Sequence, residues 1–428
     1  MSVMSPETAD AVQGLHLMAK PVGPVCNLDC DYCFYLEKEK LHAPRTKFRM
    51  SDETLRAYVR SYIAAQNTPE VEFTWQGGEP TLMGLDFFEL AVRLQREFAN
   101  GKTIRNTLQT NGTLLDDDWC AFLARENFTV GISLDGPRAL HDLHRYDKRG
   151  RSSFDDVMRG LALLRKHDVA FNVLVTVSRE VSRQPLAVYR FLKANGVRHM
   201  QFNPVVERVP TLADIARGQT FATPPQTGAT TGAAPTLTAQ SVESAAYGDF
   251  LIAIFDEWVR HDVGTVHVMN FEWALAAWCQ LPATVCLFAP RCGKAAIVEH
   301  DGSVYSCDHF MYPEYRLGNL RDDDPATLMA SPAQLAFGAA KQDALPAICR
   351  RCDYRFACHG ECPKNRFLTS PDDEPGWNYL CTGYLKYFRH ITQYMNAMAQ
   401  LLSAGLPASA VMDAFDGPLI VHRPRQDG

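Results

Sequence analysis

The spacing of the cysteines constrains this chain more than any other feature. Cys26, Cys30 and Cys33 form a C-x3-C-x2-C group near the start, and eight more cysteines lie in the second half, at Cys286, Cys292, Cys307, Cys349, Cys352, Cys358, Cys362 and Cys381. Three thiolates can hold three irons of a four-iron cluster and leave the fourth iron open, while eight can close two further four-thiolate sites. The spacing therefore predicts an iron–sulfur protein with one open and two closed clusters, and hence redox chemistry.

Other uses of cysteine fit the pattern less well. Residues 1–13 lack the basic start and apolar core of a signal peptide, which disfavours the disulfides of a secreted protein. Pairs of cysteines at C-x2-C spacing also hold structural zinc, so the eight late cysteines alone leave zinc open. The early group disfavours zinc, because the next histidine, His42, lies nine residues past Cys33 in a polar segment. Cys120 and Cys279 lie in helix-like segments and are expected to be buried apolar residues.

Composition narrows the class of partner. A chain of 428 residues with 46% hydrophobic content is long enough for one large domain and a smaller one. No apolar run approaches the ~18 residues of a membrane span, and a net charge of -6 gives no basic footprint for nucleic acid. We therefore expect neither a membrane nor a nucleic acid as partner, and instead a peptide or small molecule.

The first half of the chain alternates strand-like and helix-like segments. Strands are expected at 14–20, 71–76, 103–110, 128–135, 169–178 and 198–206, and helices at 51–66, 85–100, 116–126, 153–167 and 183–195. Six repeats of strand and helix predict an α/β fold with a parallel sheet and right-handed crossovers. A partial (β/α)6 TIM-like barrel is favoured over a flat doubly wound sheet, although periodicity hardly separates them. In both folds, ligands gather at the carboxyl ends of the strands.

The second half begins with a change of composition. Between residues 210 and 240 the chain is rich in Thr, Ala, Pro and Gly, with Asp214 and Arg217 as the only charges. Such a segment predicts a disordered loop, with a substrate-capping lid as the sharper alternative. Helices are expected at 242–260, 271–280 and 379–402, and a β-hairpin at 296–308 turning at Asp301-Gly302. The predicted divisions are thus a barrel over 14–208, a flexible low-complexity insertion over 209–241, a loop-rich cysteine-held domain over 242–403 and a C-terminal tail over 404–428.

Short motifs add a family resemblance. CNLDCDYCFY at 26–35, QGGEP at 76–80, QTNG at 109–112, SLDG at 133–136 and the late cysteine ladder resemble radical S-adenosylmethionine enzymes with a SPASM domain. Within that superfamily the chain is most similar to the anaerobic sulfatase-maturating enzymes, over roughly residues 14 to 400 without 210–240. These enzymes oxidise a Cys or Ser side chain of a sulfatase peptide to Cα-formylglycine, in the cytoplasm and without oxygen.

The resemblance also implies the cofactors and partners. The cofactors would be three 4Fe-4S clusters and S-adenosyl-L-methionine, whose cleavage gives a 5′-deoxyadenosyl radical that abstracts a hydrogen atom at Cβ. The partners would be a sulfatase polypeptide and an electron donor such as flavodoxin or ferredoxin. Spacing alone leaves the division of the eight late cysteines open. The resemblance implies one cluster on Cys286, Cys292, Cys307 and Cys362, and the other on Cys349, Cys352, Cys358 and Cys381.

By the same resemblance, eight residues would bind S-adenosylmethionine: Tyr32, Gly77, Gly78, Glu79, Asn111, Ser133, Arg145 and Val206. Glycines at 77 and 78 would let the backbone approach the methionine amino group, and the planar fork of Arg145 suits a carboxylate. Simpler explanations stay open. QGGEP and QTNG are also turn sequences, and Arg145 is also an ordinary solvated charge in a polar segment. Val206 stands where the family has a larger aliphatic residue.

Asp308 is the predicted general base, because a carboxylate beside the cluster ligand Cys307 could take the proton that the oxidised carbon loses. A turn residue after the hairpin is the alternative for Asp308. Tyr35 and Gln76 are candidates for substrate contact, and His309 is a weaker one. For Tyr35 the competing explanation is burial as a core aromatic.

Two rival functions fit part of the pattern. One is another SPASM peptide maturase, which makes thioether or carbon–carbon crosslinks and often carries a recognition domain of about 80 residues. Only 25 residues precede Cys26, which disfavours this rival. The other is a zinc or iron–sulfur scaffold or electron carrier without catalysis, which the metal content of the protein would distinguish.

Overall fold

Strands and helices alternate through the first half of the protein, as the sequence predicts. The computed structural model describes residues 14–43, 46–225 and 235–415. The strands are β1 His16–Lys20, β2 Glu70–Trp75, β3 Thr103–Thr110, β4 Phe128–Ser133, β5 Phe171–Val177, β6 His199–Pro204, β7 His267–Val268, β8 Ala295–Glu299, β9 Ser303–Tyr305, β10 Arg316–Asn319, β11 Leu368–Thr369 and β12 Pro375–Trp377. All six strands expected in the first half are therefore present.

The α-helices are α2 Asp52–Ala65, α3 Leu85–Phe98, α4 Asp117–Arg125, α5 Arg138–His141, α6 Phe154–Lys166, α7 Pro185–Ala194, α8 Leu212–Ala216, α9 Ser244–His261, α10 Met269–Trp278, α11 Pro325–Met329, α12 Pro332–Asp343, α13 Ala347–Arg350, α14 Arg355–Cys358 and α15 Cys381–Ser403. Short 3-10 helices are η1 Leu36–Leu41, η2 Pro80–Met83, η3 Val181–Arg183, η4 Cys286–Phe288, η5 Pro313–Tyr315, η6 Pro363–Asn365 and η7 Ala408–Phe415. Helix starts follow local rules: Ser51 caps α2 by accepting from the Thr54 N–H at 3.1 Å, and Asp116 caps α4 through the Trp119 N–H at 2.8 Å.

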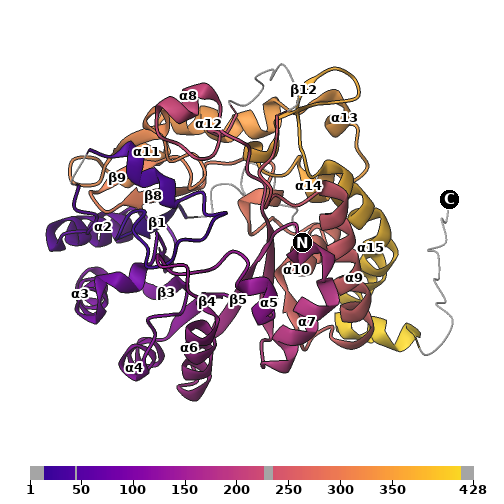
Figure 1. Cartoon of the computed structure of the whole chain (residues 1–428), viewed down its shortest axis with the longest axis horizontal. Coiled ribbons are helices and arrows are strands. Elements are labelled where there is room, and N and C mark those ends of the chain that lie inside the picture. The colour runs from indigo at the N-terminus through magenta and orange to yellow at the C-terminus, as the bar shows by residue number, and fades with distance from the viewer. Residues whose placement is uncertain (1–13, 44–45, 226–234, 416–428) are drawn as a thin grey trace.

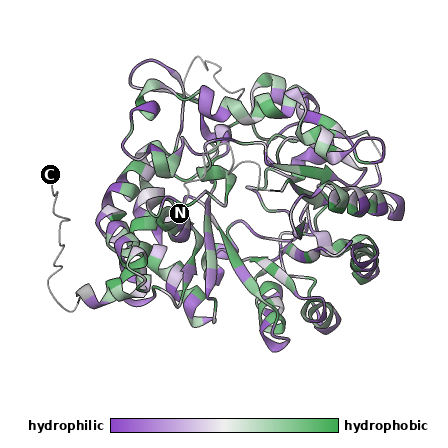
Figure 2. Ribbon diagram, turned by 180° about the vertical axis from the view of Figure 1, so that it is seen from behind, coloured by the Kyte–Doolittle hydropathy of each residue, from purple (hydrophilic) through white to green (hydrophobic). Residues whose placement is uncertain are grey.

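One sheet forms the centre of the molecule. Its strand order is β10-β9-β8-β1-β2-β3-β4-β5-β6-β7, and neighbours from β1 to β7 pair in parallel. Helices α3, α4 and α6 lie along the outer side of the curved strands (Figure 1). The strands are largely hydrophobic, whereas the helices mix hydrophobic and hydrophilic residues (Figure 2). The predicted α/β fold with a partial barrel is confirmed.

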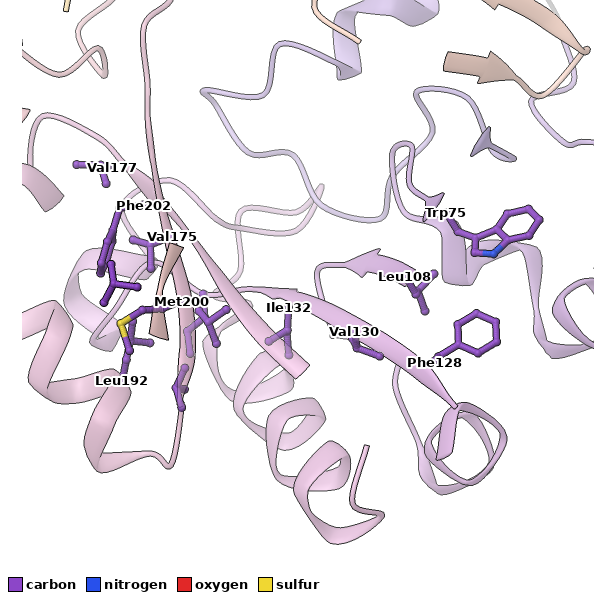
Figure 3. Close-up of a cluster of buried hydrophobic side chains, with 14 of the residues drawn as sticks. Trp75, Leu108, Phe128, Val130, Ile132, Val175, Val177, Leu192, Met200 and Phe202 are labelled. Atoms are coloured by element: carbon purple, nitrogen blue, oxygen red, sulfur yellow. The ribbon is translucent and has the colours of Figure 1, made fainter. Parts of the chain in front are cut away.

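The core of the barrel follows the sheet. Trp75 and Phe88 are buried with their rings 5.6 Å apart, which fastens α3 to β2. Figure 3 shows buried side chains that follow the sheet from β2 to β6, labelled Trp75, Leu108, Phe128, Val130, Ile132, Val175, Val177, Met200 and Phe202, with Leu192 of α7 beside them. These side chains hold the strands in register, so their carboxyl ends form one edge.

The predicted hairpin is present, but it belongs to the barrel sheet. Strands β8 and β9 pair antiparallel, with Gly302 at a φ of +86° in the turn. β8 also pairs in parallel with β1, with Lys20 opposite Glu299. The sequence analysis assigned the hairpin to a separate cysteine-held domain, because pairing between strands so far apart leaves no local pattern. This pairing brings the segment around Cys307 beside β1.

The Thr/Ala/Pro/Gly-rich excursion has regular structure in its described parts. It contains α8, whose N-cap Thr211 and third residue Asp214 form a reciprocal capping box. The two arms of the excursion meet, since the Val209 N–H donates to the Thr236 carbonyl at 2.9 Å. The expectation of a disordered loop is therefore wrong for residues 210–225 and 235–240, while residues 226–234 lie outside the described residues.

Helices α9 and α15 and the 3-10 helix η7 pack together beside α7 and α10. Helices α9 and α15 pack so closely that a Cβ on Gly248 would lie 2.5 Å from the Gly383 carbonyl oxygen. Beyond α15, η7 packs on both helices, and Val411 is buried, so the predicted tail begins as a packed element. No helix in the described ranges is long and apolar enough to cross a membrane.

Candidate active site

The loop that follows β1 carries the early cysteines at the carboxyl edge of the sheet. All thirteen cysteines of the chain are free thiols. Burial, together with the nearby charges of Glu79 and Cys33, raises the pKa of Cys26 to about 12. Burial also raises the pKa of Cys30, and Cys26 and Cys33 add to this. The three thiols are thus close enough to act on one another, as ligands of one cluster must be.

Two turns brace this loop from the neighbouring strands. The carboxylate of Glu79, after β2, is fully buried and accepts from the Thr110 hydroxyl at 2.7 Å and the Asn111 N–H at 2.7 Å. The side-chain amide of Asn111, after β3, donates to Asn27 Oδ1 at 2.8 Å and lies 3.7 Å from Cys26 Sγ. Both residues were expected to contact the cofactor. In this structure they join the QGGEP and QTNG turns to the cysteine loop.

The glycines of QGGEP have a packing reason as well as the predicted one. A Cβ on Gly78 would lie 1.9 Å from the Val25 carbonyl oxygen, so only glycine fits there. The Gly78 N–H donates to the Gly23 carbonyl at 2.7 Å. Gly77 has a φ of +137°, which L side chains rarely adopt. The turn after β2 therefore lies directly against the segment that leads into the cysteine loop.

A buried ion pair lies next to Cys30. Arg145 donates from Nε to Asp135 Oδ2 at 2.8 Å and from Nη2 to Asp135 Oδ1 at 3.2 Å. Arg145 also donates to the Thr176 hydroxyl at 2.9 Å, and the Tyr32 hydroxyl donates to Asp135. Arg145 is therefore not a solvated charge. Its fork is held by Asp135, a residue of the SLDG motif that the sequence analysis quoted without giving it a role.

This pairing yields a testable prediction for Asp135→Asn. The variant keeps the shape of the side chain but loses the charge that orients Arg145, and a hydrogen bond to a charged group contributes about 1.5–3 kcal/mol. If Arg145 binds the cofactor carboxylate, as predicted, the dissociation constant for S-adenosylmethionine should rise about tenfold or more in equilibrium dialysis under anaerobic conditions. Asp155→Asn, at a surface pair with Arg138, is the matched control and should leave it unchanged. Equal affinity in both variants would contradict this role of Asp135.

Asp308 faces β1 across the sheet. Its Oδ1 lies 2.6 Å from Lys20 Nζ, and Lys20 is buried. Burial opposes ionisation of Asp308, but Lys20 and His309 outweigh it and lower its pKa. Lys20 Nζ also lies 4.2 Å from the centre of the Tyr35 ring, and its charge acts on Cys33. Asp308 therefore lies near the early cysteine loop, in an ion pair rather than in a simple turn.

The residues around this pair differ from the sequence prediction. Tyr35 is buried and its hydroxyl donates to Glu299, a fully buried residue at the end of β8. The structure thus gives Tyr35 a core position below Lys20, which is the competing explanation. Lys20 and Glu299 were missed, because no motif marks them and only the β1–β8 pairing brings them together.

Four further predicted positions lie at or near the same edge. Ser133, the last residue of β4, accepts from Gln109 Nε2 at 3.2 Å, and Gln76 follows β2 with its side chain half-buried. Val206 is buried in the core just after β6. The ring of His309 lies 4.6 Å from that of Phe34, and its Nδ1 is buried with no hydrogen-bond partner. Each position is compatible with its predicted contact, which stays a prediction.

The late cysteines gather in two sets. In addition to burial, which is the largest effect, neighbouring thiols raise the pKa values of several of these cysteines. Such interactions join all pairs within the first set, Cys286, Cys292, Cys307 and Cys362. In the second set, Cys381 and Cys352 raise the pKa of Cys349, Cys381 and Cys349 raise that of Cys358, and Cys352 raises that of Cys381. That each set holds one cluster stays a prediction.

Buried cations accompany these thiols. Lys341 is fully buried and donates to the Cys286 carbonyl at 2.6 Å and the Leu287 carbonyl at 2.8 Å. Arg366 is buried too, and its charge interacts with Cys358, Cys362 and Cys349. Buried cations need nearby negative charge, and a cluster held by four thiolates supplies it. Neither residue was predicted to be buried, since nothing in the local sequence marks a basic residue of α12 or one just after η6 as buried.

A compact site for a single metal ion is absent among the described residues. In that part of the chain, no three or more His, Cys, Asp or Glu side chains are arranged to hold one metal ion. One zinc ion would draw its sulfur ligands to about 2.3 Å from a common point, and the described thiols do not converge in this way. Cys120, outside these groups, is buried in α4 as expected, whereas Cys279 at the end of α10 is partly exposed.

Surface cavities near the second set lie away from the strand ends. Two of them have volumes of about 140 Å³ and 740 Å³. Both are lined by Phe356 and His359, from and just after α14, and by Leu281, just after α10. Their place beside Cys358 separates them from the edge where Asp308 and Arg145 lie.

Comparisons with known proteins agree with this arrangement. A profile described as the radical SAM superfamily matches residues 21–192, and one described as an iron–sulfur cluster-binding domain, SPASM, matches residues 286–353. The chain is 44% identical to the serine-type anaerobic sulfatase-maturating enzyme of Bacteroides thetaiotaomicron, over 95% of this chain and 97% of the relative. It is 31% identical to the cysteine-type enzyme of Clostridium perfringens, over 88% and 96%.

Solved structures point to the same family. A structure described as native anSMEcpe with bound AdoMet and Cp18Cys peptide superposes with a TM-score of 0.77 at 30% identity. The match covers 91% of this chain and 99% of that one. The near-complete coverage of both chains, with the cysteine sets and motifs described above, identifies this protein as an enzyme of the anaerobic sulfatase-maturating family within the radical S-adenosylmethionine superfamily.

Proposed function

We propose that this enzyme oxidises a Cys or Ser side chain of a sulfatase polypeptide to Cα-formylglycine, with S-adenosylmethionine and three 4Fe-4S clusters as cofactors. The observation that carries the proposal is the Lys20–Asp308 pair at 2.6 Å, next to Cys307 on one side and the early cysteine loop on the other. A peptide side chain that lies between this pair and the early cysteine loop could lose a hydrogen atom, a proton and an electron within one site. The names of the relatives support the same substrate class.

The proposed residues have separate roles in holding the cofactors. Cys26, Cys30 and Cys33 would hold the open cluster, and the two late sets would hold the closed ones. When bound, S-adenosylmethionine and the clusters would together supply the 5′-deoxyadenosyl radical that takes a hydrogen atom from Cβ, and a cluster would then accept one electron. Arg145, oriented by Asp135, would hold the carboxylate of S-adenosylmethionine, with Tyr32, Gly77, Gly78, Ser133 and Val206 around the rest of it. Asn111 and Glu79 would act indirectly, because they hold together the turns that lie against the cysteine loop.

Asp308 would take the proton. After one Cβ hydrogen atom is removed, the carbon radical of a serine loses one proton and one electron to give the aldehyde directly. A cysteine gives the thioaldehyde in the same way, and water then replaces its sulfur with oxygen and releases hydrogen sulfide. Asp308 would receive the proton in either case. Gln76 and His309 are the nearest candidates to orient the peptide, and Tyr35 would act by supporting Lys20.

The proposal also covers the domain bounds, the target residue, the compartment and the electron donor. The proposed barrel over 14–208 and the cluster domain over 242–403 are supported by the profile matches, which lie inside them. The relatives include serine-type enzymes at 38–44% identity and a cysteine-type enzyme at 31%, which favours serine as the target. An oxygen-free cytoplasm and a flavodoxin or ferredoxin as electron donor complete the proposal.

The test is anaerobic turnover with synthetic peptides. Purified enzyme should contain about twelve irons, for three clusters of four. With S-adenosylmethionine and a reductant, it should convert Ser-x-Pro-x-Arg and Cys-x-Pro-x-Arg peptides to aldehydes that a hydrazide reagent traps for mass spectrometry. A colourless zinc protein would refute the enzyme, and a crosslinked peptide without aldehyde would favour the rival maturase.

A further inference from the structure

The excursion before α9 carries exposed apolar side chains. We call its described residues, 208–225 and 235–240, the strap. Val209, Leu212 and Ile215 are 44%, 86% and 55% exposed, and they are three of the ten exposed large hydrophobic residues in the described ranges. Single exposed apolar residues are normal on a protein surface, whereas a group within seven positions marks a contact site.

This apolar group is held rigidly. A helix of five residues is not stable by itself, so α8 needs external support. The buried carboxylate of Asp214 supplies it, since it accepts from the Thr211 hydroxyl at 2.6 Å, the Thr223 hydroxyl at 2.6 Å and Arg217 Nη2 at 2.9 Å. The strap therefore presents Leu212 and Ile215 from a fixed frame, so their contact with a partner costs little ordering entropy.

The strap is fastened to both sides of the cysteine loop. The buried carboxylate of Glu37, four residues after Cys33, accepts from the Thr220 N–H at 2.5 Å and the Phe221 N–H at 3.1 Å. On the other side, Gln240 Nε2 donates to Asp31 Oδ2 at 3.3 Å. Val209, Leu212 and Ile215 therefore lie on a segment that is hydrogen-bonded to both sides of the cysteine loop.

The next residue after Glu37 links the strap to the proposed base. Lys38 is buried with its Nζ 3.5 Å from the centre of the Tyr312 ring, and its charge acts on Asp308. Burial lowers the pKa of Lys38 to about 8. The segment that fastens the strap therefore also carries a side chain whose charge acts on Asp308.

The charges of the strap indicate what kind of partner it can bind. The strap contains three charged residues. Asp214 and Arg217 pair with each other at 2.9 Å, and the half-buried Arg208 donates to the Thr223 carbonyl and lies over the Phe367 ring. The one excess positive charge is thus used within the protein and makes no basic patch for nucleic acid or anionic lipid, whereas the exposed apolar side chains fit an apolar partner. A polypeptide substrate with apolar side chains beside its target segment, such as the sulfatase chain proposed above, is such a partner.

We propose that the strap is a docking surface for the substrate polypeptide, with Leu212 and Ile215 contacting apolar side chains outside the segment bound near Asp308. This inference rests on the proposed function. It predicts that long substrates bind more tightly than short ones, with most of the difference arising at these two residues.

The experiment compares two substrates in the holoenzyme. One is a short peptide with the target residue and its motif, and the other extends it on both sides with native sulfatase sequence. Leu212→Ser with Ile215→Ser should raise KM for the long peptide about tenfold, equal to about 1.4 kcal/mol, and leave KM for the short one and both kcat values unchanged. Leu402→Ser with Leu406→Ser is the matched control at the end of α15, where the side chains are 43% and 51% exposed, and should change neither.

The outcomes separate this inference from the proposed function. No aldehyde from either peptide with the unaltered enzyme would reject the proposed function itself. Aldehyde formation with an unchanged KM for the long peptide, or with equal changes for both peptides, would overturn the docking surface alone. A shift from dimer to monomer in the double variant would also overturn it, because a second copy of the chain would then be the partner.

Discussion

Replacing Cys26, Cys30 or Cys33 by Ala is expected to abolish cleavage of S-adenosylmethionine and every step after it. With two thiolates left, the proposed open cluster would lose one of its three protein ligands. Iron should fall from about twelve to about eight atoms, because the two late sets are proposed to hold clusters of their own. The measurements are 5′-deoxyadenosine by chromatography and iron by elemental analysis, both on anaerobically purified protein.

Cys120→Ala is the matched control for this series. Cys120 is fully buried in α4 and lies outside the three groups. Its replacement removes a small buried side chain and should reduce stability by about 1 kcal/mol without loss of iron or of cofactor cleavage. The assignment of the early cysteines fails if one of the three Ala variants still forms 5′-deoxyadenosine at the rate of the unaltered enzyme.

Asp308→Asn should separate the two halves of the reaction. The amide keeps the size of the carboxylate but cannot take a proton, and loss of a positioned base commonly lowers rates 10²- to 10⁴-fold, so about that loss of aldehyde is expected. Cleavage of S-adenosylmethionine should continue, because Asp308 is not part of the early cysteine loop. Aldehyde and 5′-deoxyadenosine should therefore be measured in the same reaction, and their ratio should fall.

A second carboxylate controls for charge. Glu314→Gln changes an exposed residue of η5, in the same half of the protein, and should leave the ratio of aldehyde to 5′-deoxyadenosine unchanged. Formylglycine production at the normal rate in Asp308→Asn would show that the base is another group. A loss of both products would instead point to a structural role for the Lys20–Asp308 pair.

Local patterns were sufficient for the first six strands and for the early and late groups of cysteines, whereas they hardly separated a barrel from a flat sheet. Alternating strands and helices predicted β1 to β6 within a few residues, because each strand is a short apolar run between amphipathic helices. The division of the late cysteines came from family resemblance, since spacing alone allows many pairings. Their grouping in space depends on loops that periodicity does not describe.

Long-range contacts were out of reach of the sequence analysis. Lys20 and Glu299 lie far apart in the sequence, and only the pairing of β1 with β8 brings them beside Tyr35. Asp135 was visible as part of SLDG, yet nothing local links it to Arg145. The prediction of disorder for the strap was wrong for another reason. Its composition indicated disorder, whereas two buried carboxylates, Glu37 and Asp214, order its described parts.

The β1–β8 pairing also bears on how the chain folds. Lys20 and Glu299 are 279 positions apart, so this contact closes a long loop and forms late. Until residues 295–299 leave the ribosome, β1 remains an edge strand with unpaired backbone groups, which is a hazard for aggregation. The enzyme therefore completes its catalytic edge after most of the chain has been synthesised, and a shortened chain that ends before β8 would leave that edge open to other strands.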